Sequence, residues 1–338
     1  MVKRWLITGG CGFIGTALIR YLLGNGQAQY IRVLDNLTVG TKKDLRAVCD
    51  FVERPLVSPR TPLYSDKKNA PVQQVELVQG DIRDPETCIR CCKNIDIIIH
   101  LAANTGVPMS VDKPRIDMEC NVNGTFNMLE GARIQKVQRF VFASSGAPAG
   151  EVEPPIHEEL PSHPVSPYGA SKLAGEGYCS AYYRSFGIET VALRFSNVYG
   201  YGSHHKSSVV AKFIKQAIAG EPLEIYGDGQ QTRDFIYIDD LVNAVFLSST
   251  QKGIGGEIFQ IATSRATTLN ELVKILRSIL DEYTLPQPKI VSAEVRLGDL
   301  KKNFSDTRKA EEVLGWKCRM ELLDGLRETV KYFFNSKV

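Results

Sequence analysis

The sequence predicts an α/β protein built on a doubly wound parallel sheet, with a smaller and discontinuous second domain. Two observations predict this fold class. Short apolar segments that end in polar or small residues alternate with helical segments as far as about Arg194. A glycine-rich turn, Gly9–Gly15, joins the first apolar segment to the first helix. Such a turn between a strand and a helix is typical of the dinucleotide-binding, Rossmann-type form of this fold.

The first predicted strand covers residues 5–8, and the helix after the turn covers residues 16–23. A second strand over residues 31–34 ends in Asp35, twenty residues after Gly15. Glycines in this turn let backbone amides approach a pyrophosphate at the N-terminus of the helix. An acid at this spacing accepts hydrogen bonds from the adenosine ribose and repels a 2′-phosphate. The pattern therefore predicts NAD rather than NADP.

Polar or small residues follow each later strand, where ligands bind in a doubly wound sheet. Asp81 follows one strand, His100–Ala103 follow the next, and Ser144–Ser145 follow a third. A long helix is expected to open at Asn121–Thr125. The predicted core strands cover residues 75–78, 95–99, 140–143, 190–194 and 235–238, whereas residues 41–74 are less regular, with polar surface excursions at 60–62 and 65–71.

This pattern divides the chain into two domains. Residues 1–195 and about 235–263 are expected to form the Rossmann-type domain that binds NAD. Residues 196–234 and 264–338, which are richer in loops and charge, are expected to form the substrate domain.

Tyr168 and Lys172 are the main catalytic candidates. Pro167 suits the first turn of a helix, and a helix places residues i and i+4 on one face. An ammonium near a tyrosine favours the phenolate, so this tyrosine could act as a base near neutral pH. Taken alone, the pair is more typical of an ordinary surface helix. The glycine-rich turn and the serines that follow the strand upstream favour the catalytic interpretation.

Composition excludes several classes of protein. The 338 residues carry a formal charge of +3, with 43% apolar and 23% charged residues, which is ordinary for a soluble globular protein. No run of like charge indicates nucleic acid or a membrane surface, and no apolar run reaches the ~18 residues of a membrane span. The N-terminus lacks the pattern of a signal peptide. The eight scattered cysteines are expected to be reduced, which favours a cytoplasmic location.

No metal site is predicted. Cys88, Cys91 and Cys92 lie close in sequence, but no second cysteine or histidine pair completes a site. His204 and His205 are expected to diverge because they are adjacent. His100 is interpreted as a core histidine with satisfied hydrogen bonds.

Several further motifs complete a resemblance that covers nearly the whole chain. They are Gly80–Asp84, Asn121–Thr125, Tyr168–Lys172, Arg194–Gly200, Gly227–Asp234 and Arg296–Asp299, together with the glycine-rich turn, His100–Ala103 and Ser144–Ser145. With these motifs the chain resembles the extended short-chain dehydrogenase/reductase family, in particular nucleotide-sugar epimerases of the UDP-galactose 4-epimerase kind. The resemblance implies a homodimer that acts on a nucleotide-diphosphate sugar, most simply a UDP-sugar.

The resemblance also implies roles for individual residues. Tyr168 matches the catalytic base, Ser145 the serine that hydrogen-bonds the sugar 4-hydroxyl, and Lys172 the lysine that lowers the pKa of the base. The expected NAD contacts are Gly9, Gly12, Phe13, Ile14, Asp35, Asn36, Asp81, Ile82, Leu101, Ala102, Ala103, Asn121, Tyr168 and Lys172. The expected substrate contacts are Thr105, Ser145, Asn197, Ser208, Val209, Tyr226, Arg233, Arg296 and Asn303.

Departures from the family pattern bear on the reaction. The 4,6-dehydratases of this family carry an Asp and a Glu directly after the serine or threonine, where this chain has Gly146 and Ala147. The resemblance therefore implies epimerisation at C4 through a 4-keto sugar. A dehydratase or decarboxylase that uses another acid, such as Glu151 or Glu153, is the enzymatic alternative. An NAD-binding sensor without turnover is the alternative of another class.

Overall fold

The computed structural model describes residues 3–54, 74–294 and 301–335. An eight-stranded sheet dominates its first part, in the order β12-β7-β6-β5-β1-β2-β4-β3. The strands are β1 (Lys3–Thr8), β2 (Ala28–Asp35), β3 (Val52–Arg54), β4 (Gln74–Gln79), β5 (Ile97–His100), β6 (Arg139–Ser145), β7 (Glu189–Phe195) and β12 (Glu257–Ile261). The order reverses direction at β1, which confirms the doubly wound α/β fold.

The strand register brings the carboxyl ends of the central strands together. Thr8 pairs with Leu34 of β2 and with His100 of β5, and His100 pairs with Phe142 of β6, all in parallel ladders. Apolar β-branched and aromatic residues fill these strands, as a sheet covered on both faces requires. The residues after each strand end therefore meet at one edge of the sheet.

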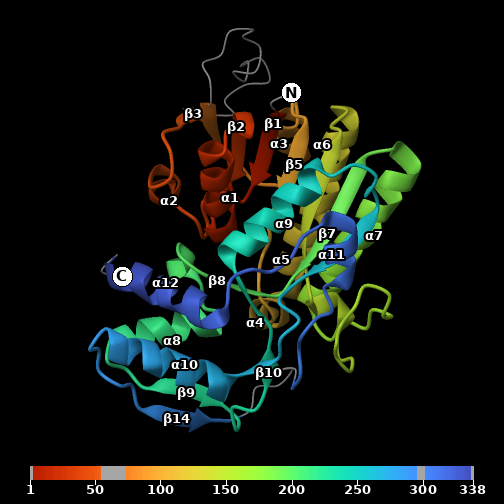
Figure 1. The fold of residues 1–338 in the computed structure, drawn as a ribbon. Coiled ribbons are helices and arrows are strands. Elements are labelled where there is room, and N and C mark those ends of the chain that lie inside the picture. The colour runs from red at the N-terminus through yellow and green to blue at the C-terminus, as the bar shows by residue number, and fades with distance from the viewer. Residues whose placement is uncertain (1–2, 55–73, 295–300, 336–338) are drawn as a thin grey trace. The chain divides into compact units, whose positions relative to one another are not determined.

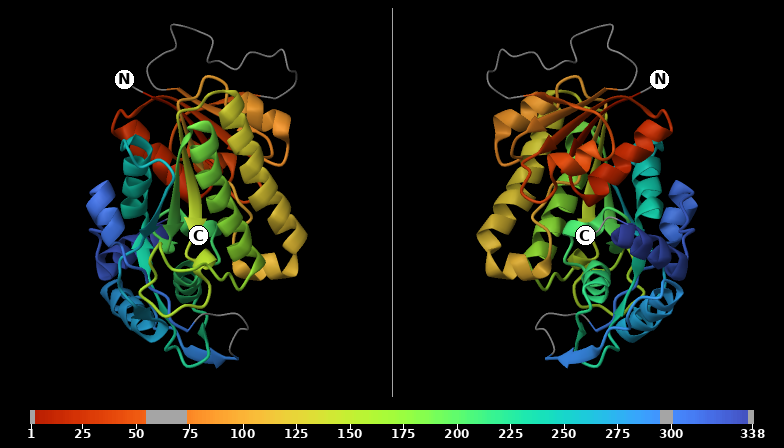
Figure 2. Two further views of the ribbon diagram at one scale, coloured as in Figure 1. Left: turned by 90° about the vertical axis from the view of Figure 1, so that its right-hand side faces the viewer. Right: turned by 90° about the vertical axis from the view of Figure 1, so that its left-hand side faces the viewer.

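Helices cover both faces of this sheet (Figures 1 and 2). α6 and α7 lie on one face, and α1 lies on the other, where Tyr21 and Trp5 pack against Phe246 of α9. These helices and their short neighbours are α1 (Phe13–Gly24), α2 (Lys42–Arg46), α3 (Pro85–Cys91), α4 (Val107–Asp112), α5 (Pro114–Met118), η2 (Glu119–Asn123), α6 (Gly124–Ile134), η3 (Ala147–Ala149), α7 (Pro167–Phe186) and α9 (Ile238–Thr250).

The chain divides into two compact units. The first contains residues 1–150, 162–194 and 244–259, and the second contains 151–161, 195–243 and 260–338. Residues 151–161, 195, 235–243 and 260–263 therefore group with the second unit, although the sequence pattern placed them in the first.

The second unit is built from short sheets and amphipathic helices. β9 pairs with β14, β8 with β11, and β10 with β13. Its elements are β8 (Asn197–Tyr199), η4 (Ser203–His205), α8 (Val209–Ile218), β9 (Leu223–Tyr226), β10 (Thr232–Arg233), β11 (Phe235–Tyr237), β13 (Thr267–Thr268), α10 (Leu269–Glu282), β14 (Ile290–Ala293), α11 (Arg308–Leu314) and α12 (Leu322–Asn335).

Three sequence predictions about these elements need correction. Residues 235–238 are not a core strand of the main sheet: β11 pairs with β8, and Ile238 opens α9. The helix expected at Asn121 is already under way there, since α5 runs into the π-helical η2. Residues 41–54 contain α2, which a Thr41–Asp44 capping box starts, and the edge strand β3. The excursions at 60–62 and 65–71 lie outside the described residues.

Among the described residues, no helix has both the length and the apolar run that a bilayer crossing requires.

Gly15 tests how closely α1 packs against the turn. A Cβ atom at Gly15 would lie 2.5 Å from both the Gly10 Cα and the Gly9 carbonyl oxygen, which are backbone atoms that cannot rotate away. We expect Gly15→Ala to lower the free energy of unfolding by at least the ~1–3 kcal/mol of an overpacked site. Denaturant titration would measure this change.

Gly24→Ala is the matched control in the same helix, because a Cβ there meets no atom within 4 Å. Its free energy of unfolding should stay unchanged or rise by up to about 1 kcal/mol. Equal stability of the two variants would contradict the packing described here.

Candidate active site

The glycine-rich turn leaves the N-terminus of α1 open. Gly9 has a φ of +68°, and a Cβ there would lie 2.9 Å from the Ala102 amide nitrogen. α1 starts after Gly12 with no capping side chain and no acid in its first turn. An uncapped helix N-terminus beside a close backbone approach fits the pyrophosphate of a dinucleotide. The turn residues Gly9, Gly12, Phe13 and Ile14 therefore suit the role that the sequence predicted for them.

Asp35 ends β2 and is 7% exposed. Its carboxylate accepts the Cys11 N–H at 2.9 Å and the Leu37 N–H at 2.8 Å. Burial raises the pKa of this carboxyl, against these two hydrogen bonds, which lower it. A carboxylate has about four acceptor sites, so Asp35 can hold the turn and still accept from a ribose hydroxyl.

Asn36 and Asp81 lie together after β2 and β4. The Asn36 Nδ2 atom donates to Asp81 at 3.2 Å, and Arg83 forms a 2.8 Å ion pair with the same carboxylate. The hydrogen bond from Arg83 lowers the pKa of Asp81 to about 2, so Asp81 is ionised at neutral pH. Ile82 is buried beside Gly124 of α6. Sequence reasoning missed Arg83, although it stands two residues after Asp81.

Asn121 fixes the loop that follows β5. It accepts the Asn104 N–H at 2.8 Å and donates to the Asn104 carbonyl at 2.9 Å. The loop begins with Leu101, Ala102 and Ala103, all partly buried, and Ala102 donates its N–H to the Thr8 hydroxyl at 3.1 Å. Thr105, on the same loop, is exposed.

α7 starts as the sequence predicted. The Ser166 hydroxyl accepts the Gly169 N–H at 3.1 Å, and Pro167 occupies the first turn. Tyr168 and Lys172 then follow one turn apart on this 20-residue helix.

Three successive turns of α7 hold the last three residues of β6. The Ser145 hydroxyl lies beside Tyr168 and acts to lower its pKa. The Lys172 ammonium donates to the Ala143 carbonyl at 2.8 Å. Glu176 accepts the Ser144 hydroxyl at 2.5 Å. The structure therefore brings the predicted catalytic residues Ser145, Tyr168 and Lys172 together.

Glu176 belongs to a buried ion pair that sequence reasoning missed. Its carboxylate forms a 2.8 Å ion pair with the Arg194 guanidinium, and both side chains are at most 3% exposed. Glu176 follows Lys172 by four residues on the same helix, so helical spacing was a signal that could have identified it.

The sequence predicted that Lys172 lowers the pKa of Tyr168, and the structure corrects this prediction. The Lys172 Nζ atom lies 5.9 Å from the centre of the Tyr168 ring and donates to Ala143 instead. Burial raises the pKa of Tyr168 to about 12, although the neighbouring Ser145 hydroxyl acts to lower it. Burial also lowers the pKa of Lys172 to about 8. Tyr168 is therefore neutral at pH 7 in this structure.

His100 is the satisfied core histidine that the sequence predicted. Its ring nitrogens lie 2.8 Å from the Thr8 hydroxyl and 3.1 Å from the Thr125 hydroxyl. Burial lowers its pKa to about 3, so the ring is neutral. The Cys88, Cys91 and Cys92 thiols are buried in the core, and burial raises the pKa of each, so they are packing residues.

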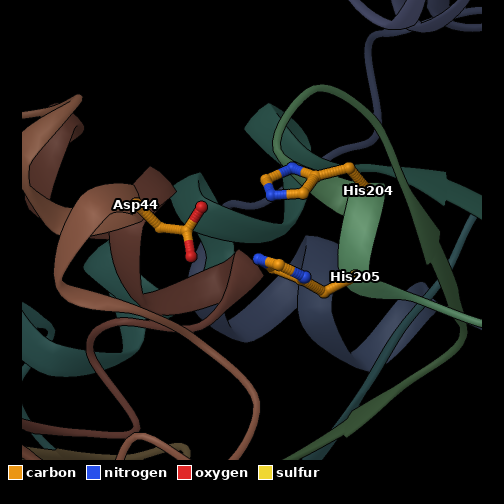
Figure 3. Close-up of side chains that lie close together, drawn as sticks. All are labelled: Asp44, His204 and His205. Carbon is orange, nitrogen blue, oxygen red and sulfur yellow. The ribbon is translucent and has the colours of Figure 1, made fainter. Parts of the chain in front are cut away.

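His204 and His205 do not diverge as expected, since their ring centroids are 4.0 Å apart in η4 (Figure 3). Figure 3 also labels Asp44, whose carboxylate accepts the Thr41 N–H at 2.8 Å and caps α2 in the other unit. The two histidines supply two nitrogen ligands from their own unit. A zinc ion usually takes about four ligands, so the pair alone defines no metal site.

The second unit contains the other predicted substrate residues. Ser208 precedes α8, and its buried hydroxyl oxygen has no hydrogen-bonding partner among the described residues. Asn197 donates to the Asp234 carbonyl at 3.2 Å, and the Asn303 N–H donates to the Thr232 hydroxyl at 3.2 Å, next to Arg233. Val209 opens α8, and Tyr226 ends β9 with its hydroxyl 2.6 Å from Glu224. Arg296 lies outside the described residues.

Known proteins share this fold and sequence. The chain is 34% identical to the UDP-glucose 4-epimerase of Mycolicibacterium smegmatis, over 98% of this chain and 99% of the relative. It is 32% identical to the dTDP-glucose 4,6-dehydratase of Haemophilus influenzae, over 98% of both chains. The crystal structure of the Thermotoga maritima UDP-glucose 4-epimerase with UDP-glucose matches with a TM-score of 0.85 at 32% identity, and covers 99% of this chain and 100% of that one.

The model of the NAD dependent epimerase/dehydratase family matches residues 5–262, which is most of the chain. The glycine-rich turn, Asp35 and the group of Ser145, Tyr168 and Lys172 all lie within the matched residues. The chain therefore belongs to the NAD-dependent epimerase/dehydratase family.

Proposed function

We propose that this protein epimerises a nucleotide-activated hexose at C4 through a transient 4-keto intermediate. One observation carries the proposal: the Ser145 hydroxyl lies beside Tyr168 and acts to lower its pKa, while the next two positions, Gly146 and Ala147, carry no acid. Ser145 and Tyr168 thus supply two neighbouring hydroxyl groups for a proton transfer at one sugar oxygen, and positions 146 and 147 add no acid or base.

NAD is the cofactor of this family, and the first unit fits it. The open N-terminus of α1, the Asp35 carboxylate and the Asn36–Asp81 pair would hold the dinucleotide. When bound, NAD supplies the acceptor for the C4 hydride and a positively charged nicotinamide ring.

Tyr168 is the proposed base and Ser145 the group that orients the 4-hydroxyl. A phenol with a pKa of about 12 is a weak acid, so its ionisation requires positive charge near the ring. Lys172 supplies one such charge but is held by the Ala143 carbonyl. We propose that substrate and cofactor binding brings further positive charge to Tyr168, which then takes the proton of the sugar 4-hydroxyl.

The structure's side chains favour epimerisation over dehydration. Elimination across C5 and C6 requires an acid and a base there. Glu151 and Glu153 were the alternative acids; both are exposed, and Glu153 forms a 2.8 Å ion pair with Lys302.

A Cβ at Gly146 would meet no atom within 4 Å. We propose that this space admits a substituted hexose, such as an N-acetylated or C6-oxidised one.

The second unit is proposed to hold the nucleotide diphosphate. The unpartnered Ser208 hydroxyl lies at the N-terminus of the ten-residue α8, where anions are favoured. Arg233 suits a pyrophosphate because a guanidinium gives charge and paired donors. UDP is the proposed nucleotide, since the UDP-glucose 4-epimerases are among the similar proteins.

A homodimer is the proposed assembly. α6 and α7 expose large apolar side chains, including Phe126, Ile134, Tyr178 and Phe186, each at least 38% exposed. The Phe126 and Tyr178 rings pack with centroids 5.5 Å apart. Contiguous exposed apolar side chains on neighbouring helices are typical of protein–protein interfaces.

The cytoplasm is the proposed location, because all eight cysteines are free thiols.

Turnover in deuterated water tests the reaction. UDP-glucose, UDP-N-acetylglucosamine and UDP-glucuronate would be incubated with the protein and the products identified by mass spectrometry and NMR. We expect an epimer of unchanged mass without deuterium on carbon. A product that is lighter by one water and deuterated at C5, where the solvent proton enters after hydride is returned to C6, would instead establish a 4,6-dehydratase.

Tyr168→Phe tests the base. The ring remains and only the hydroxyl is lost, so we expect a normal thermal unfolding curve and a loss in kcat on the order of 10²–10⁴-fold. Tyr183→Phe on the same helix, whose ring lies beside Gly255 and Gly256, should leave kcat unchanged. Near-normal turnover of the Tyr168→Phe variant would rule out Tyr168 as the base.

Analytical ultracentrifugation tests the assembly. The unmodified protein should sediment with about twice the chain mass of 37.5 kDa. Phe126→Arg should yield monomers, whereas Phe334→Arg, at an exposed position on α12, should remain dimeric. A monomeric unmodified protein would contradict the proposed assembly.

A further inference from the structure

Asp117 is a buried carboxylate that the proposed mechanism does not use. It lies on α5, directly before the π-helical η2, and is 1% exposed. Its Oδ1 atom accepts the Asn121 Nδ2–H at 2.8 Å. Its Oδ2 atom has no donor at hydrogen-bonding distance among the described residues, although the neighbouring Ser171 hydroxyl acts to lower the pKa of the carboxyl. A buried acceptor of this kind is costly, so its presence calls for a functional explanation.

Asp117 is connected to the catalytic turn of α7. The amide nitrogen of Asn121 that donates to Asp117 also lies 3.2 Å from the Ser171 hydroxyl. Ser171 directly precedes Lys172 and donates to the Tyr168 carbonyl at 3.0 Å. One short hydrogen-bonded path therefore joins the buried acid to the segment that carries both catalytic residues.

Lys172 needs a compensating negative charge. Its side chain is 3% exposed and packs over Phe142, with the ammonium 4.9 Å from the ring centre. Its hydrogen bond to Ala143 offers a carbonyl dipole rather than a full charge. A buried ammonium without a counter-charge tends to lose its proton.

Glu176 is the other carboxylate near Lys172, and its charge is already matched. It forms the ion pair with Arg194 and accepts from Ser144. Asp117 forms no ion pair within 4.0 Å among the described residues. Asp117 is therefore the carboxylate near Lys172 that has no ion-pair partner among the described residues.

We propose that Asp117 is a positioning residue for the catalytic pair: its buried carboxylate supplies the negative charge that keeps the Lys172 ammonium protonated. The consequence for turnover rests on the proposed function of Lys172 and Tyr168, but the charge coupling itself does not. The same charge disfavours the Tyr168 phenolate, so Asp117 also keeps Tyr168 protonated until substrate and cofactor are bound.

The titratable groups around this pair are consistent with the proposal. Burial lowers the pKa of Lys172 to about 8. The negative charges of Asp117 and Glu176 act to raise this pKa, and Asp117 has the larger effect. Asp117 also raises the pKa of Tyr168. Cys120 on η2, His100 on β5 and Cys179 on α7 also face these groups, and burial keeps all three neutral. Burial raises the pKa of Asp117 itself, whereas the Ser171 hydroxyl, the Lys172 charge and the Asn121 amide act to lower it.

Asp117→Asn removes the charge and keeps the shape of the side chain. The Lys172 side chain, labelled with ¹³C at Cε, would be titrated by NMR in the NAD-loaded protein and assigned with a Lys172→Arg variant. Because a negative charge raises the pKa of an ammonium, its loss should lower the Lys172 midpoint by about one pH unit. Asp112→Asn, at an exposed position on α4, is the control and should leave the midpoint unchanged.

The pH dependence of kcat separates the two proposals. If protonated Lys172 is needed for turnover, the alkaline limb should move to lower pH by the same amount in Asp117→Asn and stay in place in Asp117→Glu. An NMR midpoint that does not move would overturn the role of Asp117, whatever the rates. A midpoint that moves while the limb stays would support Asp117 and contradict the proposed role of Lys172.

A second measurement does not depend on the folding of a variant. In the unmodified protein, the carboxyl resonance of Asp117 should show an inflection at the pH where Lys172 loses its proton, because each charge senses the other. A resonance that stays flat through the Lys172 titration would overturn the proposal.

Discussion

The register of the central parallel strands fixes where every group of the first unit's candidate site lies. Thr8 pairs with Leu34 on one side and with His100 on the other, and its hydroxyl contacts both the His100 ring and the Ala102 N–H. A slip of one residue would reverse the faces of all side chains on a strand. The glycine-rich turn, Asp35 and the loop that follows β5 therefore depend on this one alignment.

The buried charged side chains of α7 fix the position of the last residues of β6. Lys172 donates to the Ala143 carbonyl and Glu176 accepts the Ser144 hydroxyl, so the two residues directly before Ser145 are fixed in position. Removal of one partner from a buried ion pair such as Glu176–Arg194 typically costs ~3–5 kcal/mol. The candidate catalytic residue Ser145 therefore depends on interactions whose loss would also destabilise the fold.

The fold alone does not decide the reaction. A 4-epimerase and a 4,6-dehydratase are 34% and 32% identical to this chain over nearly their whole lengths. The same sheet therefore accommodates different chemistry, and the difference lies in individual side chains. Here the informative positions are Gly146 and Ala147, which offer no acid, and Tyr168, whose pKa burial raises to about 12.

The sequence by itself determined the doubly wound sheet, the glycine-rich turn with Asp35, and the helix that aligns Tyr168 with Lys172, because each depends on local spacing and residue type. It could not show that Lys172 bonds to Ala143, that Tyr168 is buried enough to raise its pKa, or that β11 leaves the main sheet for β8. Nor could it show that Asp117 is buried or that Glu176 forms an ion pair with Arg194. Burial and charge compensation arise between residues far apart in the chain, so only the tertiary structure decided them.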